Sequence, residues 1–386
     1  MTAPVPMDEP LALYVHWPFC AKKCPYCDFN VHVRRTVDHG RWAAALVQEF
    51  ETLAARLDRP RPLVSIHFGG GTPSLMAPET VAAVIAAARR FPGLAGDAEI
   101  GLEANPSGSD AASFAAFRDA GVNRLSLGVQ ALDDASLAAL GRWHDAAEAA
   151  QAIRTAMSIF PNVSLDLMHG REGQTPEAWA RELEAALAFA PQHLSLYALT
   201  IEPGTPFALR QRRGTLALPP DDVQADMDLA AERICAAAGL ARYEVSNYAR
   251  PGFESVHNRV YWTYGEYIGI GPGAHGRIIS GGYRISTVTK RKPELWLASV
   301  EADGHGLAQE DALLPQEQAD ELLLMGLRLS DGVSLRRYAA LSGRPLPEHA
   351  VNALVHDGLL RIGNGHVHTT AKGRLILDEI LRRLMI

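Results

Sequence analysis

Short apolar segments alternate with helical segments between residues 11 and 199, and this alternation constrains the fold more than any other feature. The predicted strands are Leu11–Trp17, Leu63–Phe68, Glu99–Ala104, Arg124–Val129, Asn162–Met168 and His193–Leu199. The predicted helices between them are Arg41–Leu57, Pro78–Arg90, Asp110–Ala120, Asp133–Leu140 and Pro176–Ala188. Strands that alternate with helices indicate parallel βαβ units in an α/β protein. Periodicity alone does not separate a barrel from an open doubly wound sheet.

The second half of the chain has a different pattern. An irregular connection is predicted over Pro203–Pro220, a helix over Asp222–Ala238, a strand over Arg242–Tyr248 and a glycine-rich loop over Gly269–Gly276. A change in composition predicts a linker at Ala302–Leu314. Helices are then predicted over Pro315–Leu329, Ser334–Leu341 and Glu348–Asp357, with a hairpin over Gly358–Thr369. We therefore predict two domains, residues 1–301 and a helical, winged-helix-like module of residues 302–386.

Three of the four cysteines, Cys20, Cys24 and Cys27, follow the first predicted strand. A loop with this spacing can cover one face of a cubane iron-sulfur cluster, with one thiolate on each of three irons. Phe29 stands where a C-x-C ending would place a further cysteine, so one iron is left open to a small molecule. Structural zinc, with His16 or His32 as the fourth ligand, is the main alternative, although zinc sites usually have two separated cysteine pairs. A disulfide would leave one close cysteine unpaired.

Other polar residues lie where the predicted strands end. The turn Gly69–Ser74 can present backbone N–H groups to an anion, or it can be an ordinary turn. Glu103 ends the third strand and can accept hydrogen bonds from an ammonium group or from hydroxyl groups. Gln130 ends the fourth strand, and the planar guanidinium of Arg142 can pair with a carboxylate. Asp166 lies inside the fifth strand, and residues of all these types are also common on surfaces.

The cysteine run, with Tyr14 six residues before Cys20, resembles the cluster motif of radical S-adenosylmethionine (SAM) enzymes. Within that superfamily it resembles the group around oxygen-independent coproporphyrinogen III oxidase. The resemblance implies a partial (β/α)6 barrel, open at one side, that holds a [4Fe-4S] cluster on the three cysteines. It also implies that SAM chelates the open iron and is cleaved reductively to a 5′-deoxyadenosyl radical.

The resemblance also implies a set of SAM-binding residues. They are Tyr14, Gly70, Gly71, Thr72, Glu103, Gln130, Arg142, Asp166 and the backbone around Ala198. The chain departs from the family after the fifth strand, where Gly170-Arg-Glu-Gly-Gln-Thr175 replaces the common Gly-Leu-Pro-Gly-Gln-Thr. We expect this loop still to turn, because both glycines remain.

The segment His257-Asn-Arg-Val-Tyr261-Trp262 matches the H-N-x-x-Y-W signature of the HemW family, whose members are regarded as haem chaperones. The oxidase carries a cysteine at the position of Phe29 and an N-terminal extension. The likeness to HemW extends over nearly the whole chain, and it implies haem binding without decarboxylation of a porphyrinogen. His257 is then the candidate axial base, with Tyr261 and Trp262 as an aromatic wall. A structural role for His257 is the alternative.

Two other cysteine features are assigned less specific roles. Cys24-Pro25 resembles a cysteine-proline haem-binding dipeptide, but its thiolate is assigned to the cluster. Cys235 lies in an alanine-rich helix and is predicted to be an inert core residue.

Composition limits the cellular context. The net charge of −7 argues against nucleic acid as a partner, since a basic surface is its usual requirement. No apolar run approaches ~20 residues, and Met1–Pro10 has no leader pattern, so we expect a cytoplasmic protein without a transmembrane segment. Haem and haem-accepting proteins, such as respiratory enzymes at the membrane, are the expected partners, with peripheral membrane contact and a homodimer left open.

The expected function is therefore haem binding and delivery by a protein that also holds a [4Fe-4S] cluster and SAM. A radical SAM oxidoreductase, either the coproporphyrinogen oxidase or a related enzyme, is the first alternative. A redox or structural metal module without SAM is the second.

Overall fold

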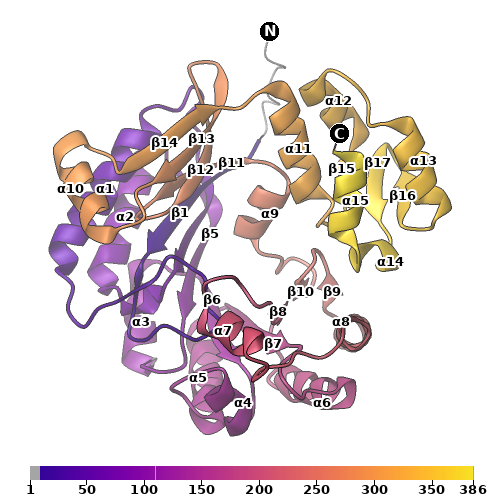
Figure 1. Ribbon diagram of the computed structural model, residues 1–386. Coiled ribbons are helices and arrows are strands. Elements are labelled where there is room, and N and C mark those ends of the chain that lie inside the picture. Colours follow the sequence, from indigo (N-terminus) through magenta and orange to yellow (C-terminus); the bar gives the residue numbers. More distant parts are fainter. Residues whose placement is uncertain (1–8, 109, 386) are drawn as a thin grey trace.

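The computed structural model describes residues 9–108 and 110–385, and within them the main sheet has 12 strands. The central strands run parallel in the order β1-β4-β5-β6-β7-β8. Their bounds are β1 Leu11–Trp17, β4 Leu63–Gly70, β5 Leu94–Ala104, β6 Arg124–Gln130, β7 Asn162–His169 and β8 His193–Ala198. This arrangement confirms the predicted α/β fold with a partial (β/α)6 barrel (Figure 1).

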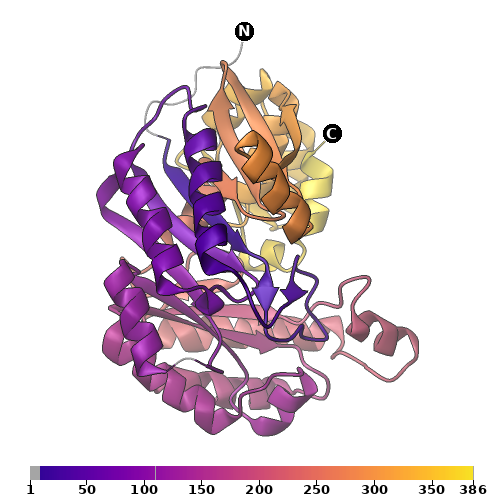
Figure 2. The ribbon, with the colours of Figure 1, turned by 90° about the vertical axis from the view of Figure 1, so that its left-hand side faces the viewer.

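Helices cover the outer face of these strands (Figures 1 and 2). They are α1 His39–Ala54, α2 Pro78–Arg90, α3 Ala111–Ala120, α4 Asp134–Ala139, α5 Ala146–Ile159 and α6 Pro176–Leu187. Asp38, Asp110 and Asp145 each accept a hydrogen bond from a backbone N–H in the first turn of the helix that follows, which defines where α1, α3 and α5 begin. The helix α5 lies in a stretch for which none was predicted.

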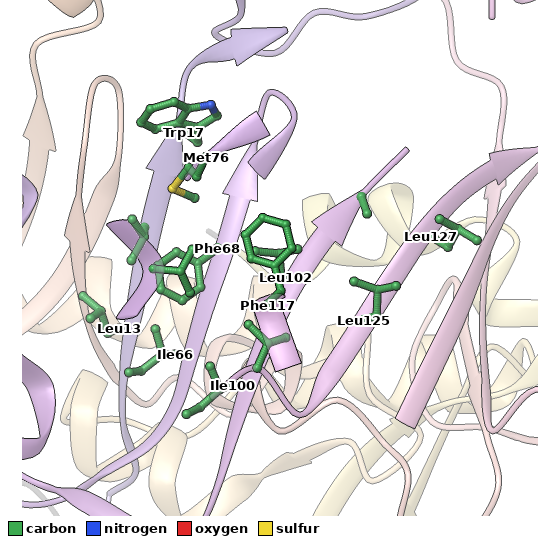
Figure 3. Close-up of a cluster of buried hydrophobic side chains, with 14 of the residues drawn as sticks. Leu13, Trp17, Ile66, Phe68, Met76, Ile100, Leu102, Phe117, Leu125 and Leu127 are labelled. Atoms are coloured by element: carbon green, nitrogen blue, oxygen red, sulfur yellow. The ribbon is translucent and has the colours of Figure 1, made fainter. Parts of the chain in front are cut away.

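Apolar side chains of neighbouring strands lie in register on the outer face. Leu13 of β1 pairs with Ile66 of β4, which pairs with Ile100 of β5. Figure 3 shows these residues with others of the same core, namely Trp17, Phe68, Met76, Leu102, Phe117, Leu125 and Leu127. Because side chains alternate along a strand, the residues between them face the inside of the barrel. The polar candidates Tyr14 and Glu103 occupy such inward positions.

Beyond β1 the sheet continues with strands that the sequence did not predict. β11 (Glu266–Ile270) is parallel to β1, and β12 (His275–Ser280), β13 (Tyr283–Thr289) and β14 (Leu307–Ala312) follow as antiparallel strands, with α10 (Pro293–Asp303) between the last two. The prediction of a loop over 269–276 is therefore wrong at both ends. Glycine is needed there because a Cβ at Gly269 would overlap the His275 carbonyl in the adjacent strand. The predicted linker 302–314 is also wrong, since β14 pairs with β13.

The opposite edge of the sheet reverses direction twice. β10 (Asn247–Ala249) is antiparallel to β8, and β9 (Ala241–Arg242) is antiparallel to β10. The single strand predicted over 242–248 is wrong, because the chain turns back between these two short strands. α8 spans Asp221–Ala237, and α7 (Pro206–Arg212) lies within the segment predicted to be irregular.

The C-terminal part forms a second hydrophobic core beside the barrel (Figure 1). Its elements are α11 Pro315–Gly326, β15 Val333–Ser334, α12 Leu335–Ser342, α13 Glu348–His356, β16 Leu360–Gly363, β17 His366–Thr369, α14 Ala371–Arg374 and α15 Leu377–Leu384. The predicted hairpin is confirmed: β16 and β17 are antiparallel and turn through Asn364 and Gly365, both with positive φ.

None of the helices in the described ranges is both long enough and apolar enough to cross a membrane. Residues 1–8, which make up most of the segment on which the expected lack of a leader depends, lie outside the described residues.

Candidate cluster and cofactor site

The three candidate cysteines lie on one loop after β1. Cys20 is buried in the short strand β2 (Phe19–Cys20), which pairs with β3 (His32–Val33) and closes the loop. Cys24 and Cys27 are half-buried, and the Cys27 N–H donates to the Cys24 carbonyl at 3.2 Å. No three His, Cys, Asp or Glu side chains in the described parts of the chain are arranged to hold a single metal ion.

A chain of hydrogen bonds joins this loop to two of the predicted SAM-binding residues. The Thr72 hydroxyl donates to Cys20 Sγ at 3.2 Å, and Asn105 Nδ2 donates to Thr72 Oγ1 at 3.1 Å. Arg142 Nη2 donates to Asn105 Oδ1 at 2.5 Å, while Arg142 Nη1 lies 3.6 Å from Cys24 Sγ. Asn105 was not singled out from the sequence, although it lies only two residues after Glu103 and ends the same strand region.

Burial favours the protonated form of two of the three thiols, Cys20 and Cys27. Burial raises the pKa of Cys20 to about 11, although the hydrogen bond from Thr72 acts in the opposite direction. Burial also raises the pKa of Cys27. A bound metal deprotonates its thiol ligands, so loading of this site would release protons. Three thiols on one loop, with a cationic Arg142 beside them, are a donor set that fits an iron-sulfur cluster.

The glycine turn after β4 packs tightly against the start of the cysteine loop. Gly70 has φ +109°, and a Cβ there would lie 2.6 Å from Cε1 of His16. A Cβ at Gly71 would lie 2.7 Å from the carbonyl oxygen of Phe19. The Gly70 N–H donates to Glu103 Oε2 at 3.2 Å. The two glycines thus let the turn approach β1 closely and hold Glu103.

Tyr14 and Glu103 line one cavity of about 450 Å³ together with Gly70. The Tyr14 hydroxyl is 3.0 Å from His16 Nδ1, and His16 Nε2 is 3.1 Å from the Asn30 carbonyl oxygen. Glu103 Oε1 is 3.1 Å from His67 Nε2. These contacts connect β1, β4 and β5 with the cysteine loop.

The remaining candidates lie on the next strands. Gln130 ends β6 with φ +69°, a conformation that costs energy for a residue other than glycine and often marks a functional site. Asp166 of β7 accepts from Ser126 Oγ at 2.9 Å, and burial raises the pKa of Asp166 to about 6. Ala198 is exposed at the end of β8. Parallel strand order brings all three toward the same edge as the cysteine loop.

The loop that departs from the family pattern turns as expected, with positive φ at Gly170 and Gly173. Arg171 is buried and forms an ion pair with Glu182 of α6, with Nη1 3.1 Å from Glu182 Oε1. The same Nη1 donates to the Gln130 carbonyl at 3.4 Å. The unusual arginine therefore anchors the loop to both α6 and the end of β6.

His257 lies in α9 (Val256–Trp262), which closes the inside of the barrel at the start of β4 and β5. The residue is 3% exposed. Its ring stacks on His67 with centroids 4.5 Å apart and has Nδ1 3.4 Å from Ser65 Oγ. Burial, His67 and Arg124 hold the pKa of His257 well below its usual value. This geometry favours the structural alternative for His257, because a haem iron has no open path to the ring.

The rest of the H-N-x-x-Y-W segment faces two directions. Tyr261 lines the 450 Å³ cavity and packs edge-on against His257. Trp262 instead stacks with the guanidinium of Arg328, 5.6 Å from the ring centroid, beside the C-terminal elements. Cys235 is fully buried in α8, in agreement with the prediction, and burial raises its pKa to about 12.

Comparisons with known proteins agree with the sequence motifs. The family model described as the radical SAM superfamily matches residues 14–186, and the HemN C-terminal domain matches residues 313–376. The chain is 38% identical to "Heme chaperone HemW" of Mycobacterium tuberculosis, over 99% of this chain and 96% of that protein. The chain belongs to the HemW family of radical SAM proteins. It is also 41% identical to the mitochondrial "Radical S-adenosyl methionine domain-containing protein 1" of Mus musculus, over 97% of this chain and 87% of that protein.

A solved structure supports the fold of this HemW family member. Coproporphyrinogen III oxidase (HemN) of Escherichia coli superposes with a TM-score of 0.80, covering 98% of this chain and 90% of that chain, at 23% identity. Membership of the radical SAM superfamily implies a [4Fe-4S] cluster and SAM. Zinc is thereby set aside as the metal of the cysteine loop.

Proposed function

We propose that this protein is a haem chaperone that carries a [4Fe-4S] cluster and SAM, binds haem and delivers it to haem-requiring proteins. The proposal is carried by the likeness of nearly the whole chain to a protein named as a haem chaperone. It is also supported by Phe29, which stands where the oxidase has a cysteine.

In this proposal Cys20, Cys24 and Cys27 hold the cluster, and SAM is held by residues of the 450 Å³ cavity together with Arg142, which lies outside its lining. A cluster with an open iron supplies an electron to a chelated ligand. Glu103 is held by Gly70 N–H and His67 and can orient the ammonium group of SAM. Arg142 is fixed beside Cys24 by Asn105 and the Gly128 carbonyl, so it can pair with the SAM carboxylate.

We place the protein in the cytoplasm, where thiols stay reduced and clusters can be assembled. Respiratory enzymes are the proposed acceptors, reached by peripheral contact with the membrane, and the protein can act as a homodimer. A radical SAM enzyme is the second candidate function. The observation that favours it is that residues predicted to bind SAM follow the same parallel strands that lead to the cysteine loop.

Anaerobic reconstitution with iron and sulfide tests the proposal. Wild type and a variant with Cys20, Cys24 and Cys27 replaced by alanine would be titrated with haem, and coproporphyrinogen III turnover would be followed in parallel. Stoichiometric haem binding without turnover is expected, with loss of the cluster absorbance only in the variant. Cysteine-dependent turnover without haem binding would identify an oxidase instead.

A further inference from the structure

The cavity that three of the predicted SAM-binding residues line has a second set of residues at its mouth. Tyr14, Gly70 and Glu103 form its half-buried inner part. Its rim is lined by Phe29, His275, Val288 and Arg291, three of which are exposed. These rim residues come from the cysteine loop, β12, β13 and the segment after β13, so only the folded sheet brings them together (Figure 1).

We propose that haem binds at this rim, with His275 as an axial ligand of the iron and Arg291 paired with a propionate. This inference rests on the proposed function, and it replaces His257 with a residue of a different strand. Haem has an apolar face, two carboxylate groups, and an iron that can bind an imidazole nitrogen. The rim offers one counterpart to each of these features.

His275 is the histidine of this cavity whose ring nitrogens are available. The other histidine that lines the cavity, His16, has Nδ1 3.0 Å from the Tyr14 hydroxyl and Nε2 3.1 Å from the Asn30 carbonyl oxygen. The exposed His275 ring has no hydrogen-bond partner among the residues that the structure describes. His257 lies outside the lining, is 3% exposed and is stacked on His67. An iron–nitrogen bond requires a free and accessible nitrogen, which His275 provides.

Arg291 is an exposed cation without an ion-pair partner among residues 9–108 and 110–385. A planar guanidinium is suited to a carboxylate and to stacking on an aromatic plane. Phe29 has 62% of its surface exposed beside it, and Val288 adds an aliphatic wall. A large exposed aromatic ring at the mouth of this cavity offers a surface that a flat apolar ligand can cover.

The rim is held in place by Asn30, which links it to the cysteine loop. Asn30 Nδ2 donates to the Pro272 carbonyl at 2.8 Å and to the Arg291 carbonyl at 2.9 Å. Glycine follows Pro272 because a Cβ at Gly273 would lie 2.6 Å from Asn30 Nδ2. The residue after Phe29 is thus bonded to the backbone of Arg291, and this contact holds the two parts of the rim together.

Titration of the reconstituted full-length chain with ferric protoporphyrin IX tests the iron ligand. We expect His275→Ala to lower haem affinity by about tenfold or more and to remove the spectrum of histidine-ligated iron. His275→Met should retain haem and change the spectrum to that of a methionine-ligated iron. His349→Ala, which removes an exposed histidine of α13, is the matched control and should behave like wild type.

The propionate contact is tested with a second probe. Arg291→Ala should weaken binding of ferric protoporphyrin IX by about tenfold and leave binding of its dimethyl ester unchanged, because the ester has no carboxylate to pair with. Arg361→Ala removes an exposed arginine of β16 and should affect neither ligand. Equal losses for haem and ester in Arg291→Ala would contradict the pairing.

The outcomes separate this inference from the proposed function. If wild type binds haem and both His275 variants bind it with the same affinity and the same histidine-ligated spectrum, the assignment of the site is overturned and the chaperone proposal stays intact. Absence of haem binding by wild type would overturn both. Loss of the histidine-ligated spectrum in His275→Ala, with a methionine spectrum in His275→Met, would establish the ligand.

Discussion

At the scale of single residues, Arg142 has the contacts of a positioning group for the cluster site. Its guanidinium contacts Asn105 Oδ1, the Gly128 carbonyl and Cys24 Sγ at the same time. Three acceptors in different directions require the planar fork of an arginine, and a lysine cannot reproduce it. The side chain therefore links the ends of β5 and β6 to the cysteine loop.

We predict that Arg142→Met lowers the affinity of the reduced, cluster-loaded protein for SAM by about tenfold, because a charge-assisted hydrogen bond to the carboxylate is lost. A SAM titration followed by the electron paramagnetic resonance spectrum of the cluster measures this. Arg154→Met, on the outer helix α5, is the control. Unchanged SAM affinity in Arg142→Met would remove this residue from the binding site.

Glu49 is a buried carboxyl group that connects several elements. It is fully buried in α1 and accepts from Gly271 N–H and Gly306 N–H, each at 2.7 Å, and from Trp296 Nε1 at 2.9 Å. Burial raises the pKa of Glu49 from 4.5 to about 7 despite these donors. The carboxyl group thus joins α1 to the β11–β12 turn and to the loop before β14.

The raised pKa predicts a pH-dependent stability. The folded state favours the protonated acid, so the contribution of Glu49 is greatest below its unfolded pKa and is lost as the pH rises toward about 7. The loss amounts to about 3 kcal/mol for a shift of this size. Urea unfolding of wild type and Glu49→Gln at pH 5 and pH 8 measures it. Between pH 5 and pH 8 the free energy of unfolding of wild type should fall relative to that of Glu49→Gln. A difference between the two proteins that is the same at both pH values would contradict the raised pKa of Glu49.

At the scale of elements, α9 is anchored by a carboxylate from the floor of the barrel. Glu99 accepts from Ser255 Oγ at 3.2 Å and from the Val256 and His257 N–H groups at 3.2 and 3.1 Å. Glu99 Oε2 also lies 3.5 Å from Nη1 of Arg124, and both side chains are buried. A negative charge at the N-terminal end of a helix also interacts favourably with the unpaired N–H groups there.

We predict that Glu99→Ala destabilises the fold by about 3–5 kcal/mol, because it leaves the Arg124 charge buried and uncompensated. Denaturant unfolding measures this. Glu51→Ala is the control, since Glu51 forms an exposed pair with Arg90 and should change stability by less than about 1 kcal/mol. Equal effects of the two substitutions would mean that Glu99 is not an anchor.

At the scale of the whole molecule, the C-terminal unit is joined to the barrel by an ionic cluster around the buried Glu9. Glu9 pairs with Arg284 of β13 and with Arg337 of α12, each at 2.5 Å. Arg337 also donates to the Tyr264 carbonyl at 3.0 Å. The unit thus contacts the sheet through residues that lie far apart in the sequence.

We predict that Arg337→Met loosens the C-terminal unit without unfolding the barrel. Amide hydrogen exchange should accelerate in residues 315–385 and stay unchanged in β5 and β6, since the second core packs around its own helices. Arg336→Met, at the exposed neighbouring position, should leave exchange as in wild type. Uniform acceleration across the chain would indicate global destabilisation instead.

Much of the barrel could be predicted because its strands and helices are local patterns. The strands β1 and β4 to β8, and the helices between them other than α5, follow from apolar alternation and caps, and the shared edge follows from parallel order. Most of the β11–β14 extension could not be predicted, because β11 and β12 contain glycine and β14 is mostly exposed, so that these strands are defined by their partners. β13 carries the β-branched residues typical of a strand and was missed. Five of the six residues of β14 are exposed, so its sequence predicts a linker, and only its pairing with β13 makes it a strand.

The sequence by itself determined the α/β class from periodicity, the three candidate cluster thiols from their spacing, and the family from the resemblance of its motifs. Only the tertiary structure decided the surroundings of His257 and His275. The backbone N–H of His257 is bonded to a carboxylate 158 positions away in the chain, and His275 reaches the cavity rim through the pairing of β11 with β1. Contacts of that range arise from packing, and no local pattern in the sequence records which histidine the fold leaves accessible.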